Sequence, residues 1–283
     1  MGNERSEDFI QALISIVGER WVFTKKEKTR FHSTGIRIGS GEVCAVIFPH
    51  KLLQFWRLLE LCVSFEKVVI IQAANTGLTG GSTPDGNNYD RDVVIINTLK
   101  LDQLILLKDA SQLIAFPGTT LYQLEEELIP FGRAPHSVIG SSCIGASVVG
   151  GVCNNSGGNL VNRGPSYTEL SLFARLNIDG KLELVNHLDI NLGDSPEEIL
   201  ANLELINFNP LDLPYSVRMA SDNEYKDRVR DIKASTPARF NADKRRLYEA
   251  SGCAGKIAVF AVRLDTFRLP KEEKVFFLGT NDP

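Results

Sequence analysis

Several classes of protein are excluded by what this 283-residue sequence lacks. Its five cysteines are odd in number and none stands in CxxC spacing, so neither a disulfide framework nor a zinc knuckle is expected. No apolar run reaches the length of about 18 residues that spans a membrane, and the N-terminal MGNERSEDFI has no apolar core of a secretory signal. A formal net charge of -4 argues against a general nucleic-acid role. A reducing cytoplasm fits these absences best.

Two common nucleotide-binding motifs are also missing. The sequence contains no G-x-x-x-x-G-K-[ST], which excludes a P-loop, and no G-x-G-x-x-G at a strand-to-helix turn, which disfavours a Rossmann site. The histidines do not pair at metal-ligand spacing either, and no metal site is expected; they are His32, His50, His136 and His187.

Alternating strand and helix patterns occupy the first hundred residues. Residues 43–48 and 68–72 are continuous apolar runs that predict buried strands. Residues 52–63 between them carry apolar side chains at helical spacing, so a right-handed βαβ unit is expected. Further strands are predicted at 93–97, 113–116, 171–177, 181–185 and 256–264, and further helices at 9–17 and 121–128.

A first glycine-rich loop, residues 72–86, directly follows a predicted buried strand. Its small side chains let the main chain approach a ligand, and successive N–H groups in such a turn form an anion-binding nest. Asn75, Thr76, Ser82 and Thr83 add side-chain donors. The loop therefore predicts a site for a diphosphate.

A second glycine-rich loop covers residues 137–158. Ser141 and Ser142 are expected to cap a helix running from Ile144 to Val149, and the N-terminus of that helix would favour negative charge. The small residues of the helix would let it lie close to a planar ring system. Two such long loops in one chain favour a ligand site over ordinary tight turns.

The order of these segments resembles the FAD-binding domain of the vanillyl-alcohol-oxidase or PCMH type. The resemblance rests on AVIFP, VVIIQAANTGLTGGS, DVVIINTLKLDQL, FPGTTLYQL and VIGSSCIGASVVGGVCNNSGG. Together with RGPSYTELSLFARLN and SGCAGKIAVFAVRLDTF, these segments resemble the bacterial quinone-dependent D-lactate dehydrogenases. The fold class that this implies is α+β, a PCMH-type FAD-binding domain of two α/β lobes with the FAD between them.

The resemblance implies FAD as a non-covalent cofactor, because loop one has no His or Cys to which a flavin would attach. By motif position, the main cofactor-binding residues are in loop one: Ala73, Ala74, Asn75, Thr76, Gly77, Gly81 and Ser82. Gly140, Ser147 and Gly157 would contribute from loop two, and Val259 would contact the flavin through its backbone. The resemblance assigns no catalytic residue to this chain.

Members of that family are about twice as long as this chain. The resemblance therefore implies an FAD-binding domain at residues 10–265, with lobes of about 10–100 and 101–265, and the start of a truncated cap at residues 266–283. The cap and a basic membrane-contacting segment would lie downstream, with the His and Arg residues that handle a 2-hydroxy acid. Whether the chain is truncated, a gene fragment or half of a split enzyme stays open.

The implied activity is oxidation of D-lactate to pyruvate, with electrons passed to a membrane quinone. The whole enzyme would lie peripherally on the cytoplasmic side of the bacterial inner membrane, and this part alone would be soluble. Other readings are a dehydrogenase for another 2-hydroxy acid, an inactive FAD-binding fragment, and a nucleotide-sugar reductase of the same superfamily.

Several individual residues allow two readings. His136 is either a hydrogen-bonded loop residue or a group near the flavin, and Arg163 pairs either with a phosphate or with a surface acid. Cys143 is read as a small packed residue rather than a redox thiol. The basic stretch from Lys226 to Arg246 is read as a solvated face, with contact to an anion as the alternative.

Overall fold

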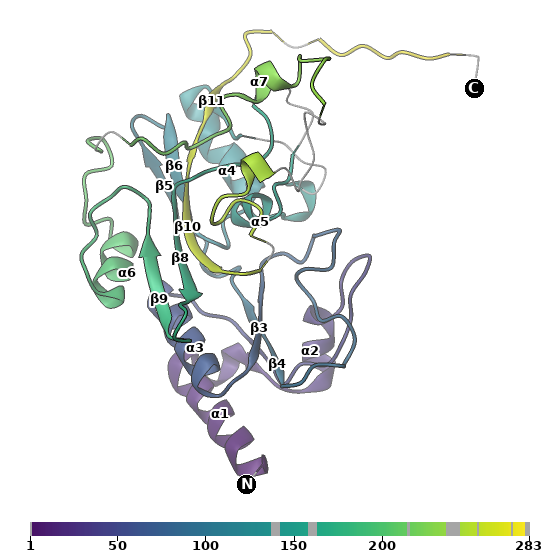
Figure 1. Ribbon diagram of the computed structural model, residues 1–283, viewed down its shortest axis with the longest axis vertical. Helices are drawn as coiled ribbons and strands as arrows, with labels where there is room; N and C mark the ends of the chain where they lie inside the picture. The colour runs from purple at the N-terminus through teal and green to yellow at the C-terminus, as the bar shows by residue number, and fades with distance from the viewer. Residues whose placement is uncertain are drawn as a thin grey trace.

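Two separate β-sheets organise the chain in the computed structural model (Figure 1). The structure describes residues 2–136, 142–157, 163–213, 216–235, 244–253, 255–272 and 274–280. The helices α1, α2 and α3 lie at the N-terminal end of the molecule, and α4, α5 and α7 lie at the opposite end (Figure 1). No helix among the described residues has the length and apolar character that crossing a lipid bilayer requires.

The first sheet has four strands in the order β1-β2-β4-β3. They are β1 (Val22–Phe23), β2 (Ala45–Ile47), β3 (Val68–Gln72) and β4 (Val93–Asn97). β2 and β3 both pair with β4 in parallel, whereas β1 is antiparallel to β2. The predicted strand–helix–strand unit is present as β2, α3 (Leu52–Ser64) and β3, but β4 lies between its two strands. Parallel strands buried on both faces explain the continuous apolar runs.

The second sheet has five antiparallel strands in the order β5-β6-β10-β8-β9. They are β5 (Leu104–Leu107), β6 (Gln112–Ala115), β8 (Ser171–Leu176), β9 (Leu182–Asn186) and β10 (Ala258–Asp265). β8 and β9, predicted as two strands, form a hairpin in whose turn Gly180 has φ of 72°. A two-stranded ribbon of β7 (Arg133–Ala134) and β11 (Phe267–Arg268) completes the strands of the described residues.

The remaining helices are short apart from the first. They are α1 (Gly2–Val17), α2 (Lys26–His32), α4 (Leu121–Leu128), α5 (Val148–Cys153), α6 (Pro196–Glu204) and α7 (Tyr225–Arg228). Single 3-10 turns occur at Glu19–Trp21, Ile129–Phe131, Ser142–Ile144 and Lys244–Arg246. Helix α6 was not predicted, although its start carries the capping pattern Ser195-Pro196: the Ser195 Oγ accepts from the Glu198 N–H at 3.2 Å.

Strand β10 joins the two main hydrophobic clusters because its side chains alternate between the faces of the sheet. Phe260 belongs to the larger cluster, with residues of α1, α3 and α6. Its ring stacks on that of Phe55 of α3, with ring centroids 4.5 Å apart. Val259 belongs to the second cluster, with Val148 and Val152 of α5. One strand therefore connects the first sheet to helix α5, which lies within loop two.

Candidate functional site

A cavity of about 520 Å³ lies at the carboxyl ends of β3 and β4. Such strand ends are where open α/β sheets commonly bind ligands. Loop one contributes the main chain of Ala73, Ala74 and Asn75, and α2 with the segment after it forms the facing wall. The lining comprises Glu27, Arg30, Phe31, His32, Thr34, Gly35, Ile36, Gln72, Ala73, Ala74, Asn75, Asn97 and Leu99.

The buried side chain of Gln72 fixes the floor of this cavity. Its Nε2 donates to the carbonyl oxygens of His32 and Ser82, both at 2.7 Å, and its Oε1 accepts from Asn97 Nδ2 at 3.1 Å. Asn97 Nδ2 also donates to the Ala73 carbonyl at 3.1 Å. One carboxamide thus ties together α2, both ends of loop one and β4. Gln72 was not predicted as a site residue; the available signal was a polar residue at the end of a buried strand.

Loop one is held in shape by its own side chains. Asn75 adopts φ of 55°, its Nδ2 donates to the Thr34 carbonyl at 2.8 Å, and its Oδ1 accepts from the Ser82 hydroxyl at 2.7 Å. The Thr83 side chain is buried, and its hydroxyl lies 3.5 Å from the Gly80 carbonyl. The Asn75, Ser82 and Thr83 side chains are therefore engaged with the protein itself, which leaves main-chain N–H groups and the Thr76 hydroxyl as the donors of this loop for a ligand.

The predicted loop-one residues fall into two groups. Ala73, Ala74 and Asn75 line the cavity, and Ser82 is bonded to Asn75. Thr76 is half-buried, whereas Gly77 and Gly81 are exposed at the outer part of the loop. A Cβ built on Gly77 or Gly81 meets no heavy atom within 4 Å. Their missing side chains leave open space over the loop, as close approach by a ligand requires.

The second predicted loop is described only in part. Gly140 lies outside the described residues, as do Ser141 and Gly158. The expectation of a helix from Ile144 is wrong: Ser142–Ile144 is a 3-10 turn, and α5 begins at Val148. Its cap is Ser147, whose Oγ accepts from the Gly150 N–H at 3.1 Å. Ser142 does not cap this helix, because Gly145 has φ of 89° and interrupts a helical path from Ser142 to Val148. Ser147 caps it instead.

The segment Phe116 to Leu121 connects the two loops. A Cβ on Gly118 would lie 2.4 Å from the Thr98 carbonyl oxygen, so only glycine packs against the end of β4 here. The Thr119 carbonyl accepts from the Val148 N–H at 2.9 Å, and the Leu121 N–H donates to the Ala146 carbonyl at 2.9 Å. The start of α5 is therefore fixed against the chain that follows the cavity.

Strand β10 offers a main-chain edge near α5. Its pairing with β6 begins only at Val262, so Val259 pairs on one side only, with Phe173 of β8, and the register with β8 shifts between Val259 and Ala261. Val259 is buried against α5, and Gly157 lies half-buried just beyond that helix. The structure thus groups Ser147 and Val259 around α5, whereas Ala73, Ala74 and Asn75 of loop one line the separate cavity.

His136 is buried before loop two, 3% exposed, and its Nε2 is hydrogen-bonded to the Ser166 hydroxyl. Its Nδ1 is buried without a partner. Burial, and secondarily the charge of Arg163, lowers the pKa of His136 to about 4. Arg163 donates to the Pro135 carbonyl at 2.8 Å and lies over the Phe267 ring. His136 is thus a neutral, hydrogen-bonded loop residue.

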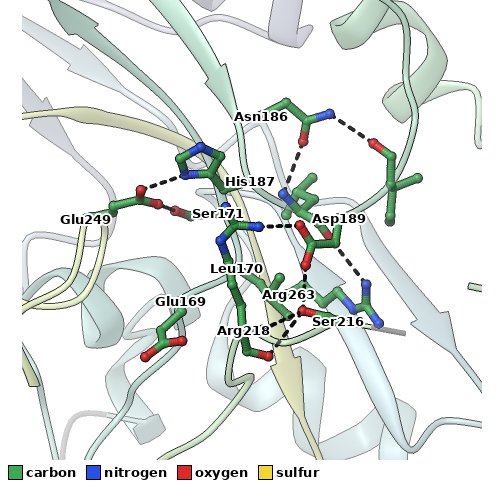
Figure 2. Close-up of polar contacts among 12 residues, drawn as sticks. Glu169, Leu170, Ser171, Asn186, His187, Asp189, Ser216, Arg218, Glu249 and Arg263 are labelled. Carbon is green, nitrogen blue, oxygen red and sulfur yellow. Dashed lines mark hydrogen bonds and ion pairs between the residues drawn. The ribbon is translucent and has the colours of Figure 1, made fainter. Parts of the chain in front are cut away.

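A polar network surrounds the buried Arg263 of β10 (Figure 2). The guanidinium of Arg263, a residue 1% exposed, donates to Gln112 Oε1 at 2.7 and 3.0 Å and to the Leu188 carbonyl at 3.0 Å. Burial lowers the pKa of Arg263, and nearby Asp189 and Asp265 partly oppose this shift. The apolar pattern of this strand gave no sign of a buried cation.

The same network anchors the segments beside β10. Figure 2 shows Arg218 and Ser216 pointing at the carboxylate of Asp189, each at 2.5 Å, and His187 Nδ1 lies 2.6 Å from Glu249 Oε1. The His187–Glu249 contact holds the turn before β10, whose Arg246 carbonyl accepts from Asn155 Nδ2 at 3.1 Å. The end of loop two, at Asn155, is therefore held by the segment that precedes β10.

The basic stretch is not a solvated face throughout. Arg228 and Arg246 are largely buried, and both pair with the fully buried carboxylate of Asp222; the Arg246 Nε lies 2.9 Å from it. Arg246 also pairs with Glu224 at 2.6 Å and lies over the Tyr167 ring. Residues 236–243 of the stretch lie outside the described residues. These pairings explain why two arginines of this stretch are buried.

The cysteines are free thiols. Cys143 is exposed, so its reading as a packed residue is wrong. Cys153, at the end of α5, is hydrogen-bonded to Cys253, and this bond lowers the pKa of Cys253 to about 7. Their separation of a hundred positions hid the pair from a search for short Cys spacings. Within the described ranges, no cluster of His, Cys, Asp and Glu suits a metal ion.

Comparison with known proteins finds a matching family model and similar relatives. Residues 43–172 match the family described as FAD binding domain. The chain is 59% identical over 275 residues to the quinone-dependent D-lactate dehydrogenase of Escherichia coli (strain K12), and 57% identical over 275 residues to that of Haemophilus influenzae. Each match covers 97% of this chain but 48% and 49% of the relative. The chain thus spans about half the length of these curated relatives.

Solved structures show the fold independently of close sequence similarity. An alkyldihydroxyacetonephosphate synthase superposes with a TM-score of 0.61 at 12% identity, covering 94% of this chain and 40% of the other. p-Cresol methylhydroxylase superposes with a TM-score of 0.60 at 11% identity, covering 95% of this chain and 44% of the other. The predicted PCMH-type FAD-binding fold and the predicted resemblance are both confirmed.

Proposed function

We propose that this chain, which carries the FAD-binding domain found in the quinone-dependent D-lactate dehydrogenases, is the cofactor-binding part of a flavoprotein that oxidises D-lactate to pyruvate. The main support is the 59% identity, across 97% of this chain, to a quinone-dependent D-lactate dehydrogenase. FAD when bound would accept the two electrons removed at C2 of the hydroxy acid. The protein contributes position and electrostatics, and D-lactate and a quinone are the proposed partners of the whole enzyme.

The FAD site that we propose has three parts. Main-chain N–H groups of Ala73 to Gly77, with Gly81 and Ser82, would hold the diphosphate. Gly140, Ser147 and Gly157 would form the wall from loop two, and the backbone of Val259 would meet the flavin. The free edge of β10 before Val262 and the open space over Gly77 and Gly81 support this arrangement.

Attachment of FAD is proposed to be non-covalent. Covalent flavin linkage needs a nucleophilic side chain, and residues 73–86 contain neither His nor Cys. The cavity lining contains one histidine, His32, whose imidazole already bonds to Gln72 at 3.3 Å. We also retain, as proposals, the domain at residues 10–265 with its lobes of about 10–100 and 101–265, the FAD between these lobes, and the start of a cap at 266–283.

The substrate and membrane contacts are proposed to involve a part of the enzyme that the curated relatives have beyond this match. We propose a peripheral position on the cytoplasmic side of the bacterial inner membrane, reached through that part. A carboxylate must be clamped and a hydroxyl proton removed for oxidation of a 2-hydroxy acid. The cavity holds main-chain donors, Arg30 and Glu27, and the buried His136 lies outside its lining; we propose that these groups serve the cofactor and that the downstream part handles the hydroxy acid.

The test is anaerobic reduction of protein-bound FAD by D-lactate, followed by flavin absorbance. We expect residues 1–283 alone to show no bleaching, and bleaching to appear when a separately expressed downstream half is added. L-lactate serves as the control substrate and should leave the flavin oxidised. Bleaching of the chain alone at the rate of an ordinary enzyme, about 1–1000 per second, would place catalytic residues within this chain and contradict the proposal.

A further inference from the structure

A positively charged side chain, that of Arg30, lines the cavity at the strand ends and has no specific role in the site proposed above. Arg30 lines the cavity from α2, and Ala73, Ala74 and Asn75 line it from loop one. Two contacts fix these walls to each other: Gln72 Nε2 donates to the His32 carbonyl at 2.7 Å, and Asn75 Nδ2 donates to the Thr34 carbonyl at 2.8 Å. The main chain that carries Arg30 is therefore held beside loop one, and the Arg30 side chain is exposed to a ligand entering the cavity.

The charge of Arg30 is not neutralised by a direct ion pair. Across the part of the chain that the structure describes, neither Arg30 nor Glu27, its neighbour in the lining, forms a side-chain ion pair or hydrogen bond. Burial lowers the pKa of His32, which keeps that lining residue neutral near pH 7. Arg30 is thus the one side chain among the lining residues that is positively charged at neutral pH. The carboxylate of Glu27 lies one helical turn away on α2.

Loop one cannot neutralise an anion by itself. The Asn75 and Ser82 side chains bond to the protein, so the donors that remain for a ligand are main-chain N–H groups and the Thr76 hydroxyl, all of them neutral. A diphosphate carries two negative charges, and a guanidinium matches phosphate oxygens with two parallel donors. An anion at the loop therefore gains most from a cation that shares its cavity.

We propose that Arg30 is a positioning residue that pairs with the diphosphate of FAD and makes the site prefer the dinucleotide over an uncharged flavin. The inference rests on the proposed function, since it assigns a residue to the diphosphate part of that site. Glu27 lies on the same side of α2 and repels a phosphate, so the diphosphate sits toward Arg30 and the loop-one amides. Arg30 would favour a charged ligand, whereas loop one provides the space and the main-chain donors for the diphosphate.

The experiment compares FAD and riboflavin binding by isothermal titration to the wild-type chain and to Arg30→Gln. Loss of a charge-assisted hydrogen bond is expected to weaken FAD binding about tenfold or more. Riboflavin has no phosphate, and its affinity should stay within about twofold. Rising salt should weaken FAD binding less in the variant than in the wild type, because one screened ion pair has been removed.

Two matched variants make the test specific. Lys25→Gln removes the same charge at the other end of α2, outside the cavity, and should leave FAD binding unchanged. Glu27→Gln removes the repelling carboxylate and should tighten FAD binding. Unchanged FAD affinity in Arg30→Gln, or an equal loss for FAD and riboflavin, overturns the inference.

Failure of the inference is distinguishable from failure of the proposed function. Wild-type protein that is folded but binds no FAD contradicts the proposed function. Inorganic pyrophosphate then serves as the probe for Arg30 by the same titration. Binding to the wild type that is lost in Arg30→Gln supports Arg30 as the anion partner, and equal binding to both proteins contradicts it.

Discussion

At the scale of single residues, the open face of loop one is the most direct target. Gly77→Asp places a carboxylate where the structure leaves space and where a diphosphate is proposed to lie. We expect FAD binding to weaken about tenfold or more, roughly 1.4 kcal/mol. Gly77→Asn adds nearly the same bulk without charge, so the difference between the two variants measures electrostatic repulsion. Equal affinity of both variants with the wild type would remove loop one from the site. Gly81→Asp and Gly81→Asn repeat the comparison.

His136 makes stability depend on pH in a predictable direction. Its pKa is about 4 in the folded chain against an ordinary value of 6.5. Between these values the unfolded chain binds the proton and the folded chain does not, so stability is full above pH 6.5 and falls as the pH drops toward 4. The loss is on the order of 3 kcal/mol.

Chemical denaturation at pH 7 and at pH 4.5 checks this contribution of His136. His136→Gln removes the titrating group, and we expect its stability to change less than that of the wild type between the two values. Other acids and bases titrate alike in both proteins, so the difference isolates His136. Parallel pH profiles for the two proteins would show that burial of His136 does not penalise protonation.

The residues of loop one could be found from sequence because small side chains and amide donors form a recognisable run. Gln72, Arg263 and the Cys153–Cys253 pair could not, for a common reason. Each acts through partners far away along the chain: Gln72 through Ser82, His32 and Asn97, and Arg263 through Gln112 and Leu188. Local patterns do not report which distant carbonyl or amide satisfies a buried polar group.

At the scale of elements, Gly118 couples the cavity to α5. A methyl group at this position would lie 2.4 Å from the Thr98 carbonyl oxygen and 2.8 Å from the Leu99 carbonyl. Backbone must move to admit it, and Gly118→Ala is expected to destabilise the fold by about 1–3 kcal/mol, the usual cost of overpacking. FAD binding should weaken as well, since the start of α5 is bonded to Thr119.

Thermal unfolding and FAD titration of Gly118→Ala measure these two effects. Gly279→Ala is the control, because a Cβ there meets nothing within 4 Å and the residue is exposed. A melting temperature and FAD affinity equal to those of the control would show that the turn at Gly118 tolerates movement. The proposed coupling of the two loops would then be wrong.

Elements with strong periodicity were predicted well, and some short elements were missed. α3 buries Leu52, Phe55, Trp56 and Leu59, the face that its spacing predicted. β5 was missed, because four apolar residues between polar neighbours suit several structures. The start of α5 was misplaced by four residues, because serines at 141, 142 and 147 are all acceptable caps in sequence and only the path at Gly145 decides between them.

At the scale of the whole molecule, the sequence predicted the α+β class and the FAD-binding type through the order of its motifs. It did not predict how strands far apart would join, such as β10 inserting between β6 and β8. Antiparallel neighbours separated by more than eighty residues leave no turn signal between them. That insertion brings the edge at Val259 to α5, and thereby completes the proposed site.

The central claim is that the folded chain binds FAD without a covalent bond. The most direct measurement is titration of the apoprotein with FAD, followed by denaturation and filtration of the complex. We predict saturation at one FAD for each chain, and recovery of all flavin absorbance in the filtrate as intact FAD. Folded apoprotein, verified by circular dichroism, that leaves added FAD unbound would contradict the account, and flavin retained on the denatured chain would contradict its non-covalent form.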